Sequence, residues 1–303
     1  MVVSMVGLSI GATIRYQGSG DWADIDTSDG NGWQGGVVPG ADDTARFNWG
    51  GNTVTLDYAA PAVTRFQAGV DESGTLVVNN GGSLTSTSDS KVGNNNFCTG
   101  TLIINAGGVV NNNSWFGIAT GNGGVKNSVY GATTGIVEIN GGTLNITSHL
   151  WMATGGVNTS NPGGPTSNAF MTIYDGGVVN VGGNLGLGTI NAGTPSAGGG
   201  VAVINVNDGG LLNLHQWSST TSIMDGSVLN INGTGTVIIG GNRGAEADAY
   251  FALGKIASDL GGIQWVYTPG DPGQDYTTIT AIPEPATMAL LGLGALALLR
   301  KKK

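Results

Sequence analysis

The sequence contains little cysteine, histidine or charge, and each shortage excludes a kind of protein. The single cysteine, Cys98, cannot form an intrachain disulfide, and with only two histidines beside it a Cys/His metal site is not expected. Only 10% of the residues are charged, whereas disordered chains usually combine high charge with low hydrophobicity. The formal net charge is −9, and it becomes −12 without the four basic residues and one acid of the last 21 residues. An acidic chain of this kind is a poor partner for nucleic acid or an anionic membrane surface.

Glycine is abundant instead, and pairs of glycines recur through the middle of the chain. Successive pairs are separated by 26, 34, 35 and 33 residues, measured at their second members, Gly82, Gly108, Gly142, Gly177 and Gly210. Apolar and polar residues alternate on both sides of each pair, which is the pattern of strands with one buried face. Glycine adopts positive φ at little cost, so each pair predicts a tight turn between two strands.

A third short apolar element follows in three of the copies, over residues 115–121, 150–156 and 185–191. Three strands and their turns make one coil, so the repeat predicts an all-β fold, a right-handed parallel β-helix of roughly six coils over residues 74–241. Stacked coils place one aliphatic residue of each copy in an internal ladder: Leu84, Val110, Leu144, Val179 and Leu212. The longer copies carry polar insertions that we expect to form loops at one corner: 122–134, 157–168 and 191–199.

A solenoid must cover its two open ends. We expect residues 13–73, which are irregular and rich in tryptophan, to form an N-terminal cap with the first strands. Residues 242–281 predict a C-terminal cap, with a helix over 245–260 and a terminal hairpin. Residues 1–12 are apolar and end in small residues, which predicts a signal peptide truncated at its start, with a plain first β-strand as the alternative.

Two groups of polar residues are candidates for calcium binding. Asp24, Asp26 and Asp29 start like a calcium loop. The glycine falls one position late, however, and Gly35 stands where such a loop has glutamate, so a polar surface loop is the favoured interpretation. Four turn residues are expected to bond local backbone, with an external calcium ladder as the alternative: Asn80, Asn140, Asp175 and Asp208. We predict no cofactor.

Three tryptophans occupy related positions after the glycine pairs, namely Trp115, Trp151 and Trp217. An exposed row of indole rings could stack on sugars, but packing into the core or a corner is favoured. Sugar-cleaving enzymes are often built on β-helices, and glycoside hydrolysis requires two carboxylates about 5–9 Å apart. Within the repeats Glu138 is the only outward acid in mid-strand, and Lys126 is the only lysine or arginine between positions 100 and 241. We therefore do not expect an enzyme.

The chain ends in three distinct parts. They are Pro283-Glu284-Pro285, fourteen mostly apolar residues over 286–299, and the basic end Arg300, Lys301, Lys302 and Lys303. Fourteen residues of helix rise about 21 Å, whereas crossing the hydrocarbon layer takes about 20 residues. By the positive-inside rule the basic end stays in the cytoplasm, so the residues before the segment lie outside. We expect a temporary transmembrane helix rather than a permanent anchor.

This three-part tail resembles the PEP-CTERM sorting signal of Gram-negative bacteria that make exopolysaccharide. The resemblance implies export by the Sec machinery, recognition by an exosortase, which is a membrane cysteine peptidase-transpeptidase, and cleavage near Pro283-Glu284-Pro285. Residues 20–44 are also similar to the N-terminal stretch of PEP-CTERM proteins with autotransporter-like β-helical repeats, although Gly32-Trp33 replaces the usual Asn-Trp.

These patterns together predict an exported protein of the cell envelope or the extracellular biofilm matrix, anchored transiently in the inner membrane. We expect a structural or adhesive role at the cell surface. The alternatives are a carbohydrate-binding module for exopolysaccharide and, less favoured, a polysaccharide lyase or hydrolase. The expected partners are exosortase, the Sec machinery and exopolysaccharide, and nucleic acid is not among them.

Overall fold

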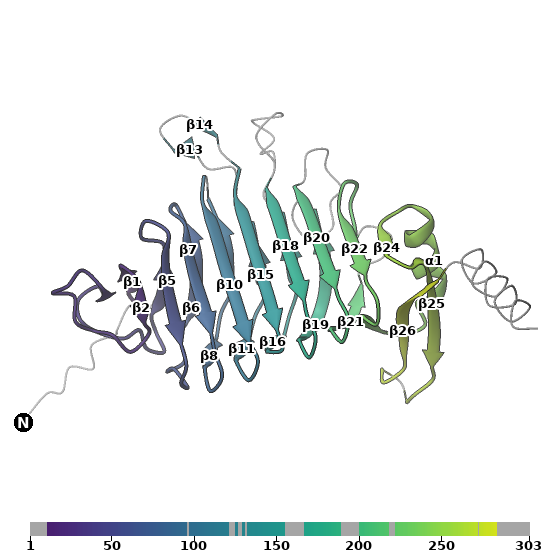
Figure 1. Cartoon of the computed structure of the whole chain (residues 1–303), viewed down its shortest axis with the longest axis horizontal. Helices are drawn as coiled ribbons and strands as arrows, with labels where there is room; N and C mark the ends of the chain where they lie inside the picture. Colours follow the sequence, from purple (N-terminus) through teal and green to yellow (C-terminus); the bar gives the residue numbers. More distant parts are fainter. Residues whose placement is uncertain are drawn as a thin grey trace, which may run out of the picture.

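The computed structural model shows a parallel β-helix, in which coils of β-strands stack along one long axis (Figure 1). The structure describes residues 11–95, 97–120, 125–126, 129–130, 132–154, 167–188, 200–217, 222–271 and 273–283. The all-β prediction is confirmed, because these residues form two large sheets and contain a single short helix.

One wall of the solenoid is a nine-stranded sheet in which neighbouring strands are parallel. Its strands, in order along the axis, are β2 (Gly20–Asp21), β5 (Asn52–Leu56), β7 (Gly74–Val78), β10 (Thr99–Asn105), β15 (Thr134–Asn140), β18 (Asn168–Ile173), β20 (Val201–Val206), β22 (Val228–Ile231) and β24 (Ile256–Ser258). Buried and outward residues alternate along β10 and β15, so each strand supplies one rung of the core.

A fifteen-stranded sheet forms the rest of the wall. Its main path runs β3 (Gly32–Trp33), β1 (Thr13–Gln17), β4 (Thr44–Phe47), β6 (Arg65–Val70), β9 (Ser90–Asn94), β12 (Phe116–Ile118), β17 (Leu150–Met152), β19 (Val178–Leu187), β21 (Leu211–Trp217), β23 (Thr236–Gly240), β26 (Tyr276–Pro283) and β25 (Gly261–Thr268). Three short parallel strands lie beside it: β8 (Ser83–Ser86), β11 (Val109–Asn112) and β16 (Thr143–Ile146). A separate antiparallel pair joins β13 (Val125–Lys126) and β14 (Val129–Tyr130).

The predicted internal ladder is present. Val110 lies opposite Leu84 in one neighbouring coil and opposite Leu144 in the other. Leu144 in turn lies opposite Val179, which lies opposite Leu212. All five side chains are fully buried. Burying one aliphatic side chain contributes about 1.5–3 kcal/mol, so each coil is stabilised by the coils on both sides of it.

The two glycines of a pair have different roles, as Gly141-Gly142 shows. Gly141 has a φ of 78°, a conformation that residues with a side chain rarely adopt. A Cβ atom on Gly142 would lie 2.6 Å from the carbonyl oxygen of Asn105 in the preceding coil. The first glycine therefore makes the turn, and the second allows neighbouring turns to stack closely.

Rows of asparagine side chains bond to one another along the outside of the solenoid. Asn145 Nδ2 donates to Asn111 Oδ1 at 2.9 Å, and Asn180 Nδ2 donates to Asn145 Oδ1 at 2.8 Å. Similar amide contacts join Asn105 with Asn79, Asn230 with Asn205 and Asn232 with Asn207. Asn145 thus donates to one neighbouring coil and accepts from the other, and such rows hold the coils in register.

Residues 13–73 form a more regular structure than their sequence leads one to expect, because the stack of parallel strands already begins within them. β4 pairs in parallel with β1 and β6, and β5 pairs in parallel with β7. A cluster of aromatic rings closes this end, with the Trp33 ring 5.0 Å from that of Trp22 and 5.6 Å from that of Phe47. Both tryptophans are fully buried, whereas Trp49 is 46% exposed.

A short helix and a hairpin cover the C-terminal end. The helix α1 (Gly244–Ala252) is shorter than the predicted 245–260, because Gly254 follows it with a φ of 67° and β24 begins two residues later. Leu253 and Leu260 are accordingly 68% and 37% exposed rather than packed on the core. β25 and β26 form the expected terminal hairpin, and β26 pairs in antiparallel fashion with β23.

Candidate functional site

The predicted sorting motif begins where the last described strand ends. Pro283 is the final residue of β26 and lies opposite Gly261 of β25. The other predicted positions of the motif and of the basic end lie outside the described residues: Glu284, Pro285, Arg300, Lys301, Lys302 and Lys303. The apolar helix expected over 286–299 and most of the predicted signal peptide, residues 1–10, lie outside them as well. Among the residues that the structure describes, no helix has the length and apolar character needed to cross a membrane.

The carboxylates of the acidic loop hold its own backbone. Asp24 Oδ1 accepts a hydrogen bond from the backbone NH of Asp26 at 3.0 Å. Asp26 Oδ1 accepts from Ser28 NH, and Asp29 Oδ1 from Asn31 NH, both at 2.9 Å. Hydrogen bonds from Ser28 and Asn31 lower the pKa of Asp26 and of Asp29, respectively. These contacts are those of Asx turns, in which a carboxylate stabilises the backbone of its own loop.

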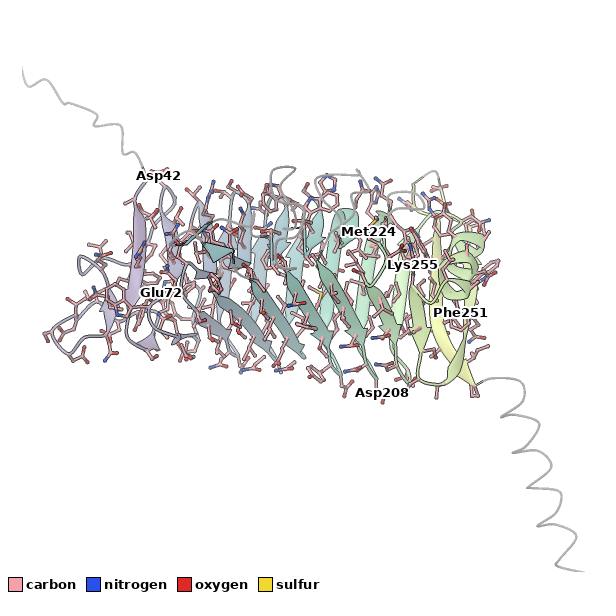
Figure 2. The ribbon with its side chains drawn as sticks, turned by 90° about the horizontal axis from the view of Figure 1, so that it is seen from above. Asp42, Glu72, Asp208, Met224, Phe251 and Lys255 are labelled. Carbon is pink, nitrogen blue, oxygen red and sulfur yellow. The ribbon has the colours of Figure 1, made fainter. Side chains whose placement is uncertain are left out.

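The turn carboxylate of Asp208 bonds to the next coil rather than to its own turn. Asp208 lies at the edge of the stack (Figure 2), and its Oδ1 accepts from Thr234 NH at 2.7 Å. In the same way the backbone NH of Gly233 donates to Asp259 Oδ1 at 2.9 Å. Within the described ranges no three His, Cys, Asp or Glu side chains come together in a way that could hold a metal ion.

Trp217 does not belong to an exposed row of indole rings. It is only 2% exposed, and its ring lies 5.3 Å from that of Tyr250 on α1. The residue is the last of β21, where the strand meets the C-terminal helix and the ring fills the space between them. The hypothesis of sugar stacking is therefore wrong for this residue.

Trp115 and Trp151, by contrast, are half-buried on the outer face of the fifteen-stranded sheet. Phe116 beside Trp115 and Met152 beside Trp151 are fully buried, so period-two alternation turns both indole rings outward. The ammonium of Lys91 lies 5.3 Å from the centroid of the Trp115 ring, which is a cation–π distance. The Trp151 ring lies 5.4 Å from the ring of His149.

Strand register brings these two rings into line with basic residues from distant parts of the sequence. Arg15 lies opposite Arg46, Arg46 opposite Gln67, and Gln67 opposite Lys91. The same column continues by way of β12 to Trp151. A second column lies beside the first. It is made of the residues two positions earlier in the sequence on the same coils, namely Arg65, Asp89, Trp115 and His149. We call the two columns together the cation–aromatic strip: Arg15, Arg46, Arg65, Gln67, Asp89, Lys91, Trp115, His149 and Trp151.

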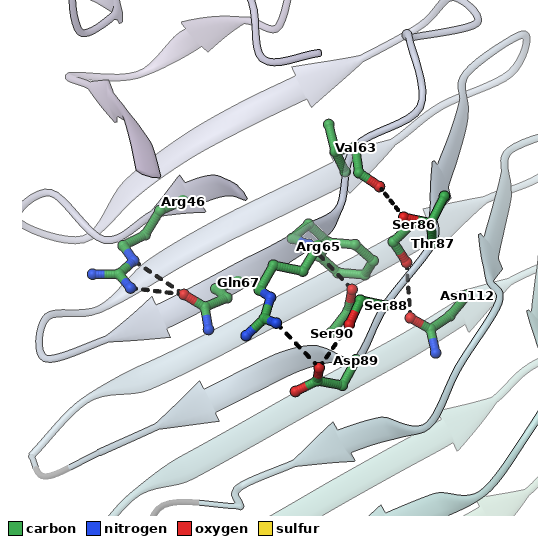
Figure 3. Close-up of polar contacts among 11 residues, drawn as sticks. Arg46, Val63, Arg65, Gln67, Ser86, Thr87, Ser88, Asp89, Ser90 and Asn112 are labelled. Carbon is green, nitrogen blue, oxygen red and sulfur yellow. Dashed lines mark hydrogen bonds and ion pairs between the residues drawn. The ribbon is translucent and has the colours of Figure 1, made fainter. Parts of the chain in front are cut away.

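Side-chain contacts tie part of this strip together (Figure 3). Nε and Nη2 of Arg46 both donate to Gln67 Oε1, at 3.1 and 2.9 Å. Nη2 of Arg65 lies 3.4 Å from Asp89 Oδ1. Burial lowers the pKa of Lys91, and none of the ion pairs among the described residues includes its ammonium. Lys91 is thus a partly desolvated cation that lies over a ring face, and the carboxylate of Asp89, which is paired with Arg65, offsets part of the effect of burial on its pKa.

The acid singled out within the repeats stands apart from other carboxylates. Glu138 is on the outer face of the nine-stranded sheet, and the register positions beside it carry Ile103 and Thr172. The register therefore places no second carboxylate next to Glu138.

The two histidines lie in different surroundings. His149 accepts a hydrogen bond at Nδ1 from Asn184 NH at 2.9 Å, and His215 is exposed.

Comparison with known proteins bears on the C-terminus. Residues 281–303 match the family described as the PEP-CTERM protein-sorting motif. No curated protein matches the sequence. A crystal structure of the TibC-catalyzed, hyper-glycosylated TibA fragment shares 13% identity over 83% of this chain and 93% of that one, but its TM-score of 0.14 is too low to bear on the fold. The motif indicates an exported protein of the cell envelope that an exosortase processes.

Proposed function

We propose that this chain is a structural or adhesive protein of the cell surface or the extracellular matrix, released from the inner membrane when its sorting tail is cleaved. The observation that carries the proposal is the sorting motif at residues 281–303, which begins in the last three residues of the terminal hairpin. The motif overlaps only the last three residues of the hairpin that closes the solenoid, so cleavage after Pro283 removes no described strand.

The proposal can be tested by expressing the full chain in a Gram-negative host that has an exosortase. Glu284→Ala should leave the full-length protein in the membrane fraction, whereas the unaltered chain is cleaved and released. Glu138→Gln is a matched control, because it also removes one acid but lies on the solenoid wall. Normal release of the Glu284→Ala chain, measured by fractionation and intact mass, would contradict sorting by this motif.

A carbohydrate-binding module is a second candidate, which the half-buried, outward rings of Trp115 and Trp151 favour. Rings in this position can offer a flat apolar face to a sugar while their edges remain packed. Binding of the purified full chain to a glycan array would support this function, and a passive scaffold would bind none of the glycans.

We also propose that the chain is not an enzyme. The isolation of Glu138 from a second carboxylate in the register supports this view, because glycoside hydrolysis requires a pair. Release of reducing ends from any member of a broad panel of acidic and neutral polysaccharides would show that the proposal is wrong.

A further inference from the structure

We propose that the cation–aromatic strip binds a linear acidic polysaccharide, one that carries carboxylates on some of its sugars. The inference gives the proposed adhesive role a partner class and rests on that role for its biological meaning. Its physical basis is the strip itself, so binding by the purified chain does not depend on whether sorting occurs as proposed.

The first argument is the distribution of charge. Four of the eleven basic residues belong to the C-terminal end, and four of the other seven lie on the strip: Arg15, Arg46, Arg65 and Lys91. The chain without its tail has a formal charge of −12, so a cluster of cations on one face is an exception to its composition. Such a cluster attracts an anion locally although the whole protein is acidic.

The second argument is the state of Lys91. Its ammonium is partly buried, lies over the Trp115 ring and takes part in none of the described ion pairs. The Asp89 carboxylate acts on it electrostatically but is paired with Arg65. A partly desolvated cation that is not in an ion pair is stabilised by an incoming anion more than a fully hydrated one would be. The rings of Trp115 and Trp151 stand beside it on the next two coils, where pyranose rings can stack.

The third argument is the shape and length of the strip. It crosses six successive strands of one sheet, from β1 through β4, β6, β9 and β12 to β17. Adjacent strands lie about 4.8 Å apart, so the strip is about 24 Å long. A straight row of this length on a sheet face fits an extended polymer better than a compact small molecule.

Acceptor groups on the strip favour a glycan over nucleic acid. Asp89 presents a partly exposed carboxylate next to the cations, whereas the oxygen of the buried Gln67 is already taken up by Arg46. Sugar hydroxyls can donate to a carboxylate such as that of Asp89, whereas the phosphates of a nucleic acid cannot.

The test measures binding of the purified full chain to polygalacturonate by titration calorimetry. Fully methyl-esterified polygalacturonate, neutral dextran and a single-stranded oligodeoxythymidylate serve as comparison ligands. We expect binding to polygalacturonate that weakens as salt is added, much weaker binding to the methyl ester, and none to dextran.

The variants locate the site. Lys91→Gln and Trp151→Ala should each weaken binding about threefold to tenfold, and Lys91→Arg should restore most of it. Lys255→Gln and Trp265→Ala remove a lysine and a half-exposed indole at the C-terminal end of the solenoid, and they should leave binding unchanged. Unchanged thermal melts would show that each variant is folded.

Three results would overturn the inference. They are no binding to polygalacturonate, equal binding to its methyl ester, and tighter binding to the oligodeoxythymidylate. Loss of binding in the Lys255→Gln and Trp265→Ala controls would also refute it, because the site would then lie elsewhere. None of these results bears on release of the chain by an exosortase, which the Glu284→Ala experiment tests separately.

Discussion

The internal ladder can be tested at Leu144, which is fully buried between Val110 of one coil and Val179 of the next. Leu144→Ala removes apolar contacts on both sides and leaves a cavity, which typically costs about 2–5 kcal/mol. In a chain of this size each kcal/mol lowers the melting temperature by about 2–4 °C, so a loss near 3 kcal/mol lowers it by about 6–12 °C.

Leu144→Asp has a larger effect, because it also places a carboxylate without a partner between stacked coils. The cost of desolvating an unpaired charge is several kcal/mol, a large part of the 5–15 kcal/mol that typically stabilises a protein. We expect the central coils to unfold in this variant. Thr143→Asp is the matched control, since it adds the same charge one residue away on the outer face.

Urea unfolding followed by circular dichroism, with the thermal melt, measures both variants. Hydrogen exchange adds the location, because in a solenoid the coils next to the substitution should lose protection first. If Leu144→Asp melts at the same temperature as Thr143→Asp, the register on which the ladder depends is wrong.

Three further predictions follow from single contacts. Asn145→Ala breaks the hydrogen bonds to Asn111 and Asn180 at 2.9 and 2.8 Å, so it should lower the free energy of unfolding by about 1–3 kcal/mol in urea titrations. Burial raises the pKa of the Cys98 thiol, so the native chain should react with iodoacetamide much more slowly at pH 8 than the urea-unfolded chain, and equal rates would contradict its burial. Burial also raises the pKa of Tyr16 to about 12, so the stability that its protonated form contributes should be lost as the pH rises from 10 to 12; Tyr16→Phe should remove this part of the pH dependence of urea unfolding.

The repeat was predictable because its signals are local. The alternation around Leu144 and the glycine pair at 141–142 can be recognised within about a dozen residues, and the structure confirms both the buried ladder and the turn. The extent of the helix over 245–260 was not predictable in the same way. Its apolar spacing continued past Gly254, where the backbone turns to positive φ and the chain enters β24.

The candidate sites likewise divide into those that the local sequence could predict and those that depend on contacts with distant residues. The carboxylates at Asp24 and Asp26 bond to backbone two residues away, which a loop interpretation of the sequence already favoured. Trp217 and Trp151 share similar local surroundings in the sequence, yet one is buried against Tyr250 and the other faces outward. Only the neighbouring helix distinguishes them, and a helix packed from another part of the chain leaves no trace in the local pattern.

The sequence by itself determined the strand pattern, the glycine turns and the sorting motif at residues 281–303, because each of these depends on near neighbours in the chain. The tertiary structure alone decided that Arg46, Lys91 and Trp151 share one column and that Asn111 bonds to Asn145. Coil lengths vary between 21 residues, from Arg46 to Gln67, and 35 residues, from Asn145 to Asn180, so positions that meet across coils have no constant spacing in the sequence. Backbone pairing between whole strands sets that register, and the outer surface follows from it.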